Sequence, residues 1–180
     1  MKSYNHSTIF SGLVIDIEQF EVEIGQRGRH TYQIIRHPGG AGALPVHDDG
    51  TVSLIRQLRP AVDAVLLEIP AGRLSPEEEP SACAGRELRE ETGITAENLI
   101  PLGIVYSSPG VFDEVVHLFA ATGLTHGAAQ PEADEEIEVL RLPLAEALQM
   151  AADGRISDAK TLAALFRWDL RGRSGNSCHA

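Results

Sequence analysis

The first third of the chain alternates apolar and polar residues, which is the pattern of strands with one buried face. The alternating runs are 8–18, 20–24 and 32–37, with a turn over 25–29. The stretch Asp48-Asp49-Gly50 predicts a β-hairpin between strands over 43–47 and 51–57, because Asp-Gly is favoured in tight hairpin turns. This part of the chain is therefore expected to be β-structure.

The remaining two thirds of the chain mixes strands with helices. A helix is predicted over 80–91, because Pro80 is tolerated in a first turn and Gly93 is typical of a helix C-terminus. Further strands are expected over 65–70, 100–105, 115–120 and 137–142, and further helices over 144–152 and 158–170. The pattern is that of an α+β protein in which strands dominate and one helix is central.

Composition and charge exclude several classes of protein. With 180 residues, of which 43% are hydrophobic, the chain can bury the core of one domain with a small extension. A net charge of −11 argues against a nucleic-acid or anionic-membrane binder, because phosphate surfaces select clustered Lys and Arg. No signal peptide and no run of about 18 apolar residues is visible, so a cytoplasmic protein is expected. Cys83 and Cys178 form neither a disulfide framework nor a CxxC metal motif.

Three carboxylates on the predicted central helix are the most informative feature. At about 100° per residue, Glu87, Glu90 and Glu91 fall within roughly a third of the helix circumference. Arg86 and Arg89 are expected around the other side of the helix. An arc of carboxylates beside an apolar edge suits a hard divalent cation with oxygen ligands. The alternative is an ordinary solvated acidic face.

A longer pattern begins at Gly72. The chain reads Gly72, five residues, Glu78, seven residues, and then Arg86-Glu87-Leu88-Arg89-Glu90-Glu91-Thr92-Gly93-Ile94. This agrees at every defined position with the Nudix box, G-x5-E-x7-R-E-U-x-E-E-x-G-U, where U is aliphatic. At typical residue usage the fixed positions coincide by chance in about one of 10⁸ windows. The chain therefore resembles the Nudix hydrolases.

The resemblance implies a Nudix-type α/β/α sandwich with a mixed sheet, and a site formed by a strand, a loop and a helix. The implied magnesium ligands are Glu87 and Glu91, then Glu90 through a second ion or a water, and the backbone carbonyl of Ala71. Manganese would be able to replace magnesium. An ion pair between Arg86 and Glu78 would hold the loop against the helix, and Gly72 and Gly93 would serve the backbone geometry.

Segments outside the box resemble the ADP-ribose pyrophosphatase subfamily. These segments are 56–60, 67–72, 107–114 and 158–161. The third contains Pro109, which lies 15 residues beyond Ile94, in a Ser-Pro-Gly-x-x-x-Glu setting. The resemblance runs from roughly Tyr32 to Trp168 and implies that Pro109 and Gly110 lie at the substrate.

An acidic protein that binds a diphosphate needs arginines at the site, because guanidinium binds phosphate in a bidentate manner. By its place in the resembling segment, Arg59 is the first candidate for the phosphates and Arg56 the second. The candidates for the adenosine part are Arg27, Arg29 and Arg36. Each of these is equally well interpreted as a solubilising charge. Glu68 and Glu114 would support the metal site, or would pair with a nearby arginine.

The general base is expected in the acidic loop that precedes the predicted strand at 137–142. In the subfamily that the chain resembles, a loop glutamate just before an Ile-Glu-Val strand is thought to activate the water. Where some relatives carry that glutamate, this chain has Ala133. Glu135 and Glu132 are therefore the two candidates.

Together these features predict a magnesium-dependent Nudix hydrolase that converts ADP-ribose to AMP and ribose 5-phosphate. Residues 1–40 would form strands exchanged within a homodimer, 41–170 the Nudix domain, and 171–180 a frayed tail. Two alternatives are a pyrophosphatase for another nucleoside diphosphate sugar, such as GDP-mannose, and a non-catalytic nucleotide-binding protein. The mutually repelling carboxylates argue against the non-catalytic alternative, since a binder has no need of them.

Overall fold

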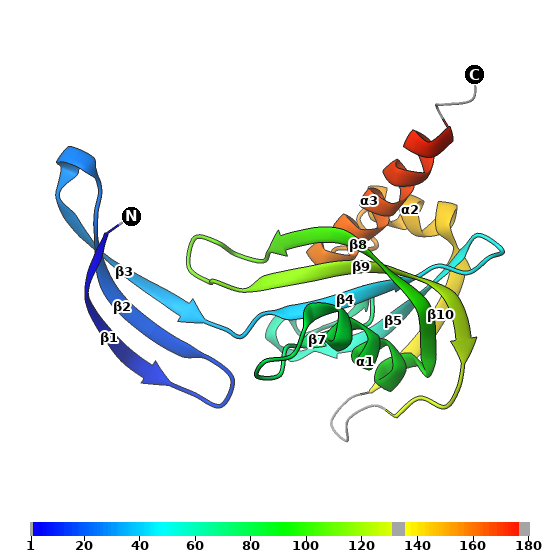
Figure 1. Ribbon diagram of the computed structural model, residues 1–180, viewed down its shortest axis with the longest axis horizontal. Coiled ribbons are helices and arrows are strands. Elements are labelled where there is room, and N and C mark those ends of the chain that lie inside the picture. The colour runs from blue at the N-terminus through cyan, green and yellow to red at the C-terminus, as the bar shows by residue number, and fades with distance from the viewer. Residues whose placement is uncertain (1, 131–135, 177–180) are drawn as a thin grey trace. The chain divides into compact units, whose positions relative to one another are not determined.

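The structure is a computed structural model that describes residues 2–130 and 136–176 (Figure 1). The strands are β1 (Ser3–Ser11), β2 (Asp16–Glu23), β3 (Arg29–Arg36), β4 (Gly40–Pro45), β5 (Thr51–Arg59), β6 (Ala64–Glu68), β7 (Ala71–Arg73), β8 (Ile94–Tyr106), β9 (Val115–His126) and β10 (Ile137–Pro143). The helices are α1 (Pro80–Thr92), α2 (Leu144–Ala152) and α3 (Ala159–Asn176), with 3-10 turns η1 (Gly25–Arg27) and η2 (Pro60–Val62). The chain forms an N-terminal unit, made of residues up to 39 together with 106–115, and a larger unit made of the rest.

In the N-terminal unit, β1, β2 and β3 form an antiparallel sheet in that order. The prediction of one strand over 8–18 is wrong, because the chain reverses between β1 and β2, where the Gly12 N–H donates to the Ile15 carbonyl at 2.9 Å. The alternation continues on both sides of this turn, so the sequence pattern does not reveal it. The segment 106–115 joins this unit through backbone hydrogen bonds to β3.

The larger unit contains a four-stranded sheet in the order β7-β4-β9-β8 and a three-stranded sheet in the order β10-β5-β6. β4 and β9 run parallel, from Gly40 opposite Val116 to Pro45 opposite Ala121, whereas β4 and β7 are antiparallel. The four-stranded sheet is therefore mixed, as predicted. Helix α1 packs on one face of it, and α2, α3 and the second sheet pack against the other (Figure 1).

Side chains of the central strands alternate between two cores. In β4, Ala41 and Ala43 face α1, whereas Leu44 faces the core shared with α2 and α3. In β9, Phe119 faces α1 and Leu118 faces the other core. This alternation is the period of two that a strand imposes on its side chains. The small side chains of β4 allow α1 to pack closely beside β7.

The predicted hairpin between β4 and β5 is only partly correct. Its turn is present, since the Gly50 N–H donates to the His47 carbonyl at 3.0 Å. Beyond a bridge between Val46 and Val52, however, the two strands enter different sheets. Both edges of β4 are taken by β7 and β9, so β4 has no edge left for β5.

Helices α1 and α2 lie where they were predicted, and α1 ends at Gly93 with φ +70°. Helix α3 ends at Asn176, beyond the end near Leu170 that the sequence predicts. An ion pair of 2.8 Å between Asp169 and Arg173, one helical turn apart, supports this extension. Among the described residues, no helix is long and apolar enough to cross a membrane.

Candidate active site

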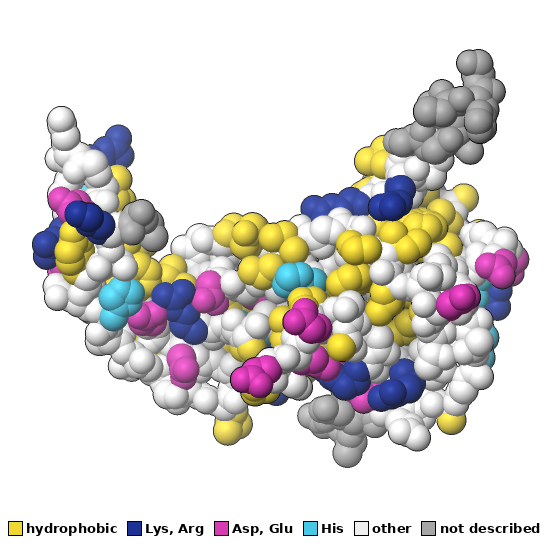
Figure 2. Space-filling view, in the orientation of Figure 1, with side chains coloured by type: hydrophobic (Ala, Val, Ile, Leu, Met, Phe, Trp, Pro, Cys, Tyr) yellow, Lys and Arg dark blue, Asp and Glu magenta, His cyan; other side chains and the backbone are white. Residues whose placement is uncertain are grey.

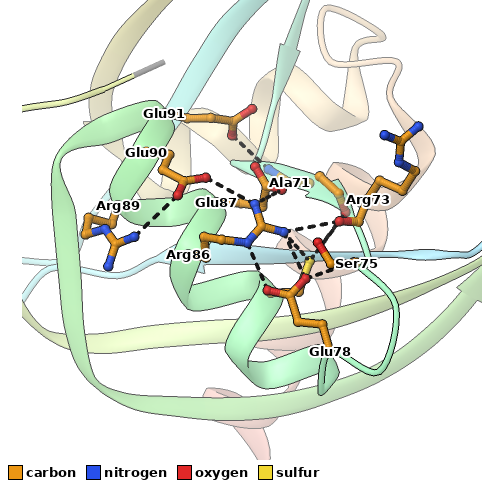
Figure 3. A network of polar contacts seen from close by, with 11 residues as sticks. Ala71, Arg73, Ser75, Glu78, Arg86, Glu87, Arg89, Glu90 and Glu91 are labelled. Carbon is orange, nitrogen blue, oxygen red and sulfur yellow. Dashed lines mark hydrogen bonds and ion pairs between the residues drawn. The ribbon is translucent and has the colours of Figure 1, made fainter. Parts of the chain in front are cut away.

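The contact between strand β7 and helix α1 is built around Gly72. A Cβ atom at Gly72 would lie 2.1 Å from Glu87 Oε1, so only glycine leaves room for that carboxylate. One residue earlier, the Ala71 N–H donates a hydrogen bond of 2.9 Å to Glu91 Oε2 (Figure 3). Glu91 is only 2% exposed. Strand β7 therefore fixes the positions of two predicted metal ligands.

Arg86 lies among the carboxylates of α1, which corrects the expectation that it occupies the other side of the helix. Its Nη1 is 2.6 Å from Glu87 Oε1 and 3.1 Å from Glu90 Oε2 (Figure 3). Arg89 also reaches Glu90, at 3.3 Å. An arginine side chain is long enough to fold back over its own helical turn, so acidic and basic groups are interspersed over α1 (Figure 2).

The expected ion pair between Arg86 and Glu78 is present. Arg86 Nε and Nη2 donate to the two Glu78 oxygens at 2.9 and 3.0 Å, and Nη2 also donates to the Arg73 carbonyl at 3.2 Å. Hydrogen bonds from Arg86 and from the Ser75 N–H lower the pKa of Glu78 to about 2. Glu78, and then Glu87, in turn raise the pKa of Arg86 against the effect of burial. The ion pair between Glu78 and Arg86 therefore holds the loop between β7 and α1 against the helix.

The donor atoms at this site are oxygens, which is the chemistry that hard divalent cations require. They belong to Glu87, Glu90, Glu91 and the Ala71 carbonyl. Within the described part of the chain, no three His, Cys, Asp or Glu side chains are grouped to hold a metal. Arg86 Nη1 takes up the position between Glu87 and Glu90. A metal cation bound by Glu87 and Glu90 would have to share the space between them with the Arg86 guanidinium. The role of the three glutamates and the Ala71 carbonyl as metal ligands stays a prediction.

Cys83 is a residue of the site that the sequence did not suggest. It is fully buried, and its thiol lies 3.7 Å from the Gly72 carbonyl and 3.5 Å from the Arg73 carbonyl. Burial, and then the charge of Glu78, raise the pKa of this thiol to about 12. Cys83 is therefore a neutral thiol that packs against the backbone at the start of the loop. In the sequence, only its spacing of three residues from Arg86 could have indicated that it lies near the site.

Arg59, the first candidate for the phosphates, is paired with Glu68. Its Nε and Nη2 donate to the two Glu68 oxygens at 2.8 and 2.7 Å. Lys160 also donates to Glu68 and lies 3.0 Å from Asp158. Burial raises the pKa of Glu68, but Arg59 and Lys160 outweigh burial and lower it. Glu68 is thus paired with a nearby arginine, and its role in supporting the metal site stays a prediction.

The start of α3 is hydrogen-bonded to the segment between β6 and β7, which leads into the site. Asp158 Oδ2 accepts hydrogen bonds from the Thr161 N–H and hydroxyl at 2.9 and 2.6 Å. The Thr161 hydroxyl oxygen accepts from the Ile69 N–H at 2.8 Å. Ile69 lies two residues before Ala71, so this link supports the backbone that holds Glu91. The sequence pointed to 158–161 only as a resembling segment and gave its residues no role.

The other predicted substrate residue of the larger unit is Arg56. Its side chain is exposed and lies 3.7 Å from Glu138, its neighbour across the pairing of β5 with β10. This is an ordinary cross-strand charge pair. A role of Arg56 toward phosphate stays a prediction.

The remaining candidates, Arg29, Arg36, Pro109, Gly110 and Glu114, belong to the N-terminal unit. The Arg29 guanidinium lies over the Tyr4 ring, 4.0 Å from its centroid, and Arg36 pairs with Glu18 and Asp113. Glu114 Oε1 lies 3.5 Å from His37 Nδ1. Pro109 and Gly110 are in a turn. Their substrate roles stay predictions.

The stem of the acidic loop is attached to the end of α1. The Gly127 N–H donates to the Gly93 carbonyl at 2.7 Å, and the Gln130 N–H donates to the Glu90 carbonyl at 2.8 Å. A Cβ atom at Gly93 would lie 2.4 Å from the Gly127 carbonyl oxygen, so this approach requires glycine. The candidate bases, Glu132 and Glu135, lie outside the described residues.

Two comparisons with known proteins decide the family. A family model described as the NUDIX domain matches residues 36–165. An ADP-ribose pyrophosphatase of Bacillus subtilis (strain 168) is 39% identical over 178 residues, which cover 95% of this chain and 96% of that protein. The chain belongs to the Nudix family. The box that begins at Gly72 lies inside the matched NUDIX domain, and the prediction of a Nudix hydrolase is confirmed.

Further proteins similar to this Nudix chain carry other names. A methanol dehydrogenase activator of Bacillus methanolicus is 36% identical, over 91% of this chain and 90% of that protein. A GDP-mannose pyrophosphatase of Cronobacter sakazakii (strain ATCC BAA-894) is 35% identical, over 91% and 89%. A crystal structure of an ADP compounds hydrolase superposes with a TM-score of 0.82, over 99% of this chain and 96% of that chain, at 23% identity. The last comparison confirms the fold.

Proposed function

We propose that this Nudix protein hydrolyses the diphosphate of ADP-ribose and related ADP-sugars, giving AMP and, from ADP-ribose, ribose 5-phosphate. The observation that carries the proposal is the placement of Glu91, which is 2% exposed and held by the Ala71 N–H, beside Glu87 on the Gly72 backbone. Burying a charged carboxylate is costly, and a divalent cation in the site would offset that cost. The similarity to an ADP-ribose pyrophosphatase over 95% of the chain supports the choice of substrate.

Nudix hydrolases generally use divalent cations, and we assign Mg²⁺ to this one, with Mn²⁺ able to replace it. Glu87, Glu90, Glu91 and the Ala71 carbonyl would hold the cations. Bound there, they would neutralise charge on the diphosphate and lower the pKa of the attacking water. Arg86 keeps the Glu87 and Glu90 carboxylates close together against their mutual repulsion.

A glutamate of the acidic loop would take the proton of the attacking water. The stem of the loop supports this role, since Gln130 is hydrogen-bonded to α1 at the Glu90 carbonyl. After the loop, the chain re-enters the sheet at Ile137, which pairs with Gln57 two residues before Arg59. Both ends of the loop are thus attached to elements that carry site residues. Glu135 and Glu132 are the candidates.

A substrate panel tests the proposal and separates it from its alternatives. Purified protein with Mg²⁺ is incubated with ADP-ribose, ADP-glucose and GDP-mannose, and the nucleotide products are separated by chromatography. We expect AMP from both ADP-sugars, formed at a higher kcat/KM than GMP from GDP-mannose. Preferred turnover of GDP-mannose would favour the activity named for the Cronobacter relative. Tight nucleotide binding without any turnover would instead favour a binding protein.

We further propose a homodimer in which residues 1–40 are exchanged between subunits. The described part of the N-terminal unit carries exposed apolar side chains, with Phe10 at 53% exposure and Leu13 fully exposed. Strand β1 is exposed along nearly its whole length. A partner strand or sheet face would cover this apolar surface, which a monomer leaves in water.

A further inference from the structure

Glu68 is a buried carboxylate with two cationic partners. Its side chain is 1% exposed, and both of its oxygens already accept hydrogen bonds from Arg59. A bidentate arginine is sufficient to balance the charge of one carboxylate. Lys160 nevertheless donates to the same Glu68 Oε2 from α3, 92 residues away in the sequence. The second cation therefore needs an explanation beyond the pairing of Glu68 with Arg59.

The two cations differ in how firmly they are held. The Lys160 side chain is 15% exposed and lies 3.0 Å from Asp158, whose other oxygen is fixed by the backbone and hydroxyl of Thr161. The Arg59 side chain is 38% exposed and ends strand β5 just before Pro60. Lys160 is thus a fixed partner of Glu68, whereas Arg59 has open solvent on one side.

The partner of Arg59 leads directly into the acidic site, because Glu68 lies three residues before Ala71, whose N–H donates to Glu91 Oε2 at 2.9 Å. After Glu68, the charge of Glu91 is among those that raise the pKa of the Arg59 guanidinium. A diphosphate bound beside Glu91 would compete with Glu68 for this guanidinium. Without a second cation, the departure of Arg59 would leave a buried carboxylate unpaired, which is strongly unfavourable.

We propose that Lys160 is a positioning residue that balances the charge of Glu68 while Arg59 leaves it to bind the diphosphate of the substrate. This inference rests on the proposed function, because it requires a diphosphate at the site. It deepens that function by assigning Arg59 to two alternating partners, the Glu68 carboxylate and the substrate phosphates. Asp158 orients Lys160 and so takes part indirectly.

The test is the binding of a non-hydrolysable analogue, α,β-methylene ADP-ribose, measured by calorimetry. Lys160→Met keeps the aliphatic stem and removes the charge, so Arg59 should stay bound to Glu68. We expect the Kd of the analogue and the KM of ADP-ribose to rise about tenfold, which is about 1.4 kcal/mol, with kcat changed less than about threefold. Lys160→Arg should restore both constants.

A double-mutant cycle with Glu68→Gln makes the test specific. When the carboxylate is gone, Lys160 has no charge to balance, so Lys160→Met should leave the Kd of Glu68→Gln unchanged. The double variant pairs two neutral side chains and is expected to fold, as checked by its thermal transition, even if Lys160→Met alone does not. An equal rise in Kd in both backgrounds, or a Kd equal to that of wild type in Lys160→Met, would overturn the inference.

The results that would contradict the proposed hydrolysis differ from those that would contradict the role of Lys160. If wild-type protein binds the analogue but turns over no nucleotide sugar, the proposed hydrolysis is contradicted while the cycle still reports on Lys160. If wild-type protein hydrolyses ADP-ribose and the cycle shows no coupling between Lys160 and Glu68, only the inference is contradicted. If wild-type protein does not bind the analogue, both are contradicted.

Discussion

At Gly72 the backbone of β7 touches a carboxylate of α1, and no side chain fits between them. The Glu87 oxygens lie 2.1 and 2.6 Å from the place of a Cβ atom. Because these atoms end a flexible side chain, a larger residue at position 72 would displace the carboxylate and leave the backbone in place. Gly72 therefore leaves the space that the carboxylate of Glu87, a predicted metal ligand, occupies.

Gly72→Ala should reduce turnover and leave the fold nearly intact. Moving the Glu87 carboxylate by about an ångström should lower kcat for ADP-ribose about 100-fold. The free energy of unfolding, from urea titration, should change by less than about 1 kcal/mol. Steady-state kinetics beside that titration checks both values.

Gly85→Ala, in helix α1, is the matched control for Gly72→Ala in strand β7. A Cβ atom at Gly85 would meet Leu99 at an ordinary contact distance of 3.5 Å. Alanine is the better helix former, so this variant should be more stable by about 0.5–1 kcal/mol and fully active. Wild-type kcat in Gly72→Ala, or an equal loss of kcat in Gly85→Ala, would contradict the role of Gly72.

The sequence predicted the residues of the Nudix box but not all of their contacts. Gly72 and the ion pair of Arg86 with Glu78 are where the pattern places them. The contacts of Arg86 with Glu87 and Glu90 were not predicted. Residue spacing on a helix gives the direction of each Cβ atom but not the conformation of a long side chain. Lys160 was missed because its partner Glu68 is 92 residues away.

At the scale of elements, the loop and helix of the site are joined by charged groups whose effect depends on pH. The pKa of Glu78 is lowered from its usual 4.5 to about 2 by Arg86 and the Ser75 N–H. A carboxylate with a lowered pKa stabilises the folded state above its usual pKa, and this contribution is lost as the pH falls toward the lowered value. The Glu78 contribution therefore disappears between those two values.

Glu78→Gln should be less stable than wild type at neutral pH, and the difference in Tm should shrink as the pH falls from about 6 to about 3. Glu79→Gln is the control, because Glu79 is exposed and adjacent in sequence. Thermal unfolding in the presence of EDTA measures the effect without bound metal. A constant difference in Tm across this pH range would show that the ionised carboxylate of Glu78 is not what stabilises the loop.

The two candidate bases can be separated by comparing Glu132→Gln with Glu135→Gln. Removal of the base should lower kcat by about 10²-fold or more with little change in KM, whereas removal of an ordinary loop charge should do neither. Glu136→Gln, in the described part of the same segment, is a suitable control. Near-normal rates in both candidate variants would leave the loop without a base.

Elements set by local sequence were predicted well, whereas pairing between distant strands was not. The bounds of α2 and the end of α1 at Gly93 follow from helical periodicity and a glycine cap. The separation of β4 from β5 into different sheets depends on β7 and β9, which lie much later in the chain. The turn at Gly12 was hidden because alternation has the same period on both sides of it.

At the scale of the whole molecule, part of the net charge of −11 can be located. Glu87, Glu90 and Glu91 cluster on α1, and Arg86 compensates them only in part. An anionic substrate would therefore meet a site that is favourable to it only when cations are bound. This would reconcile the acidic composition with the proposed action on a diphosphate.

The proposed dimer predicts a mass of twice 19.4 kDa in sedimentation experiments. The double substitution Phe10→Asp with Leu13→Asp places charges on the exposed apolar surface of the N-terminal unit and should shift the protein to monomers. Leu170→Asp, at an apolar position on α3 that is 59% exposed, should leave the dimer intact. A wild-type monomer at micromolar concentration would contradict the dimer.

The measurement that tests the central claim most directly is the release of AMP from ADP-ribose by wild type and by Glu91→Gln, with and without Mg²⁺. Glutamine keeps the size of Glu91 and can still accept the Ala71 hydrogen bond, so the variant should fold normally. We predict Mg²⁺-dependent release of AMP by wild type and a loss of about 10³-fold or more in kcat in the variant. An equal rate in Glu91→Gln, or AMP release by wild type that does not depend on a divalent cation, would contradict the account.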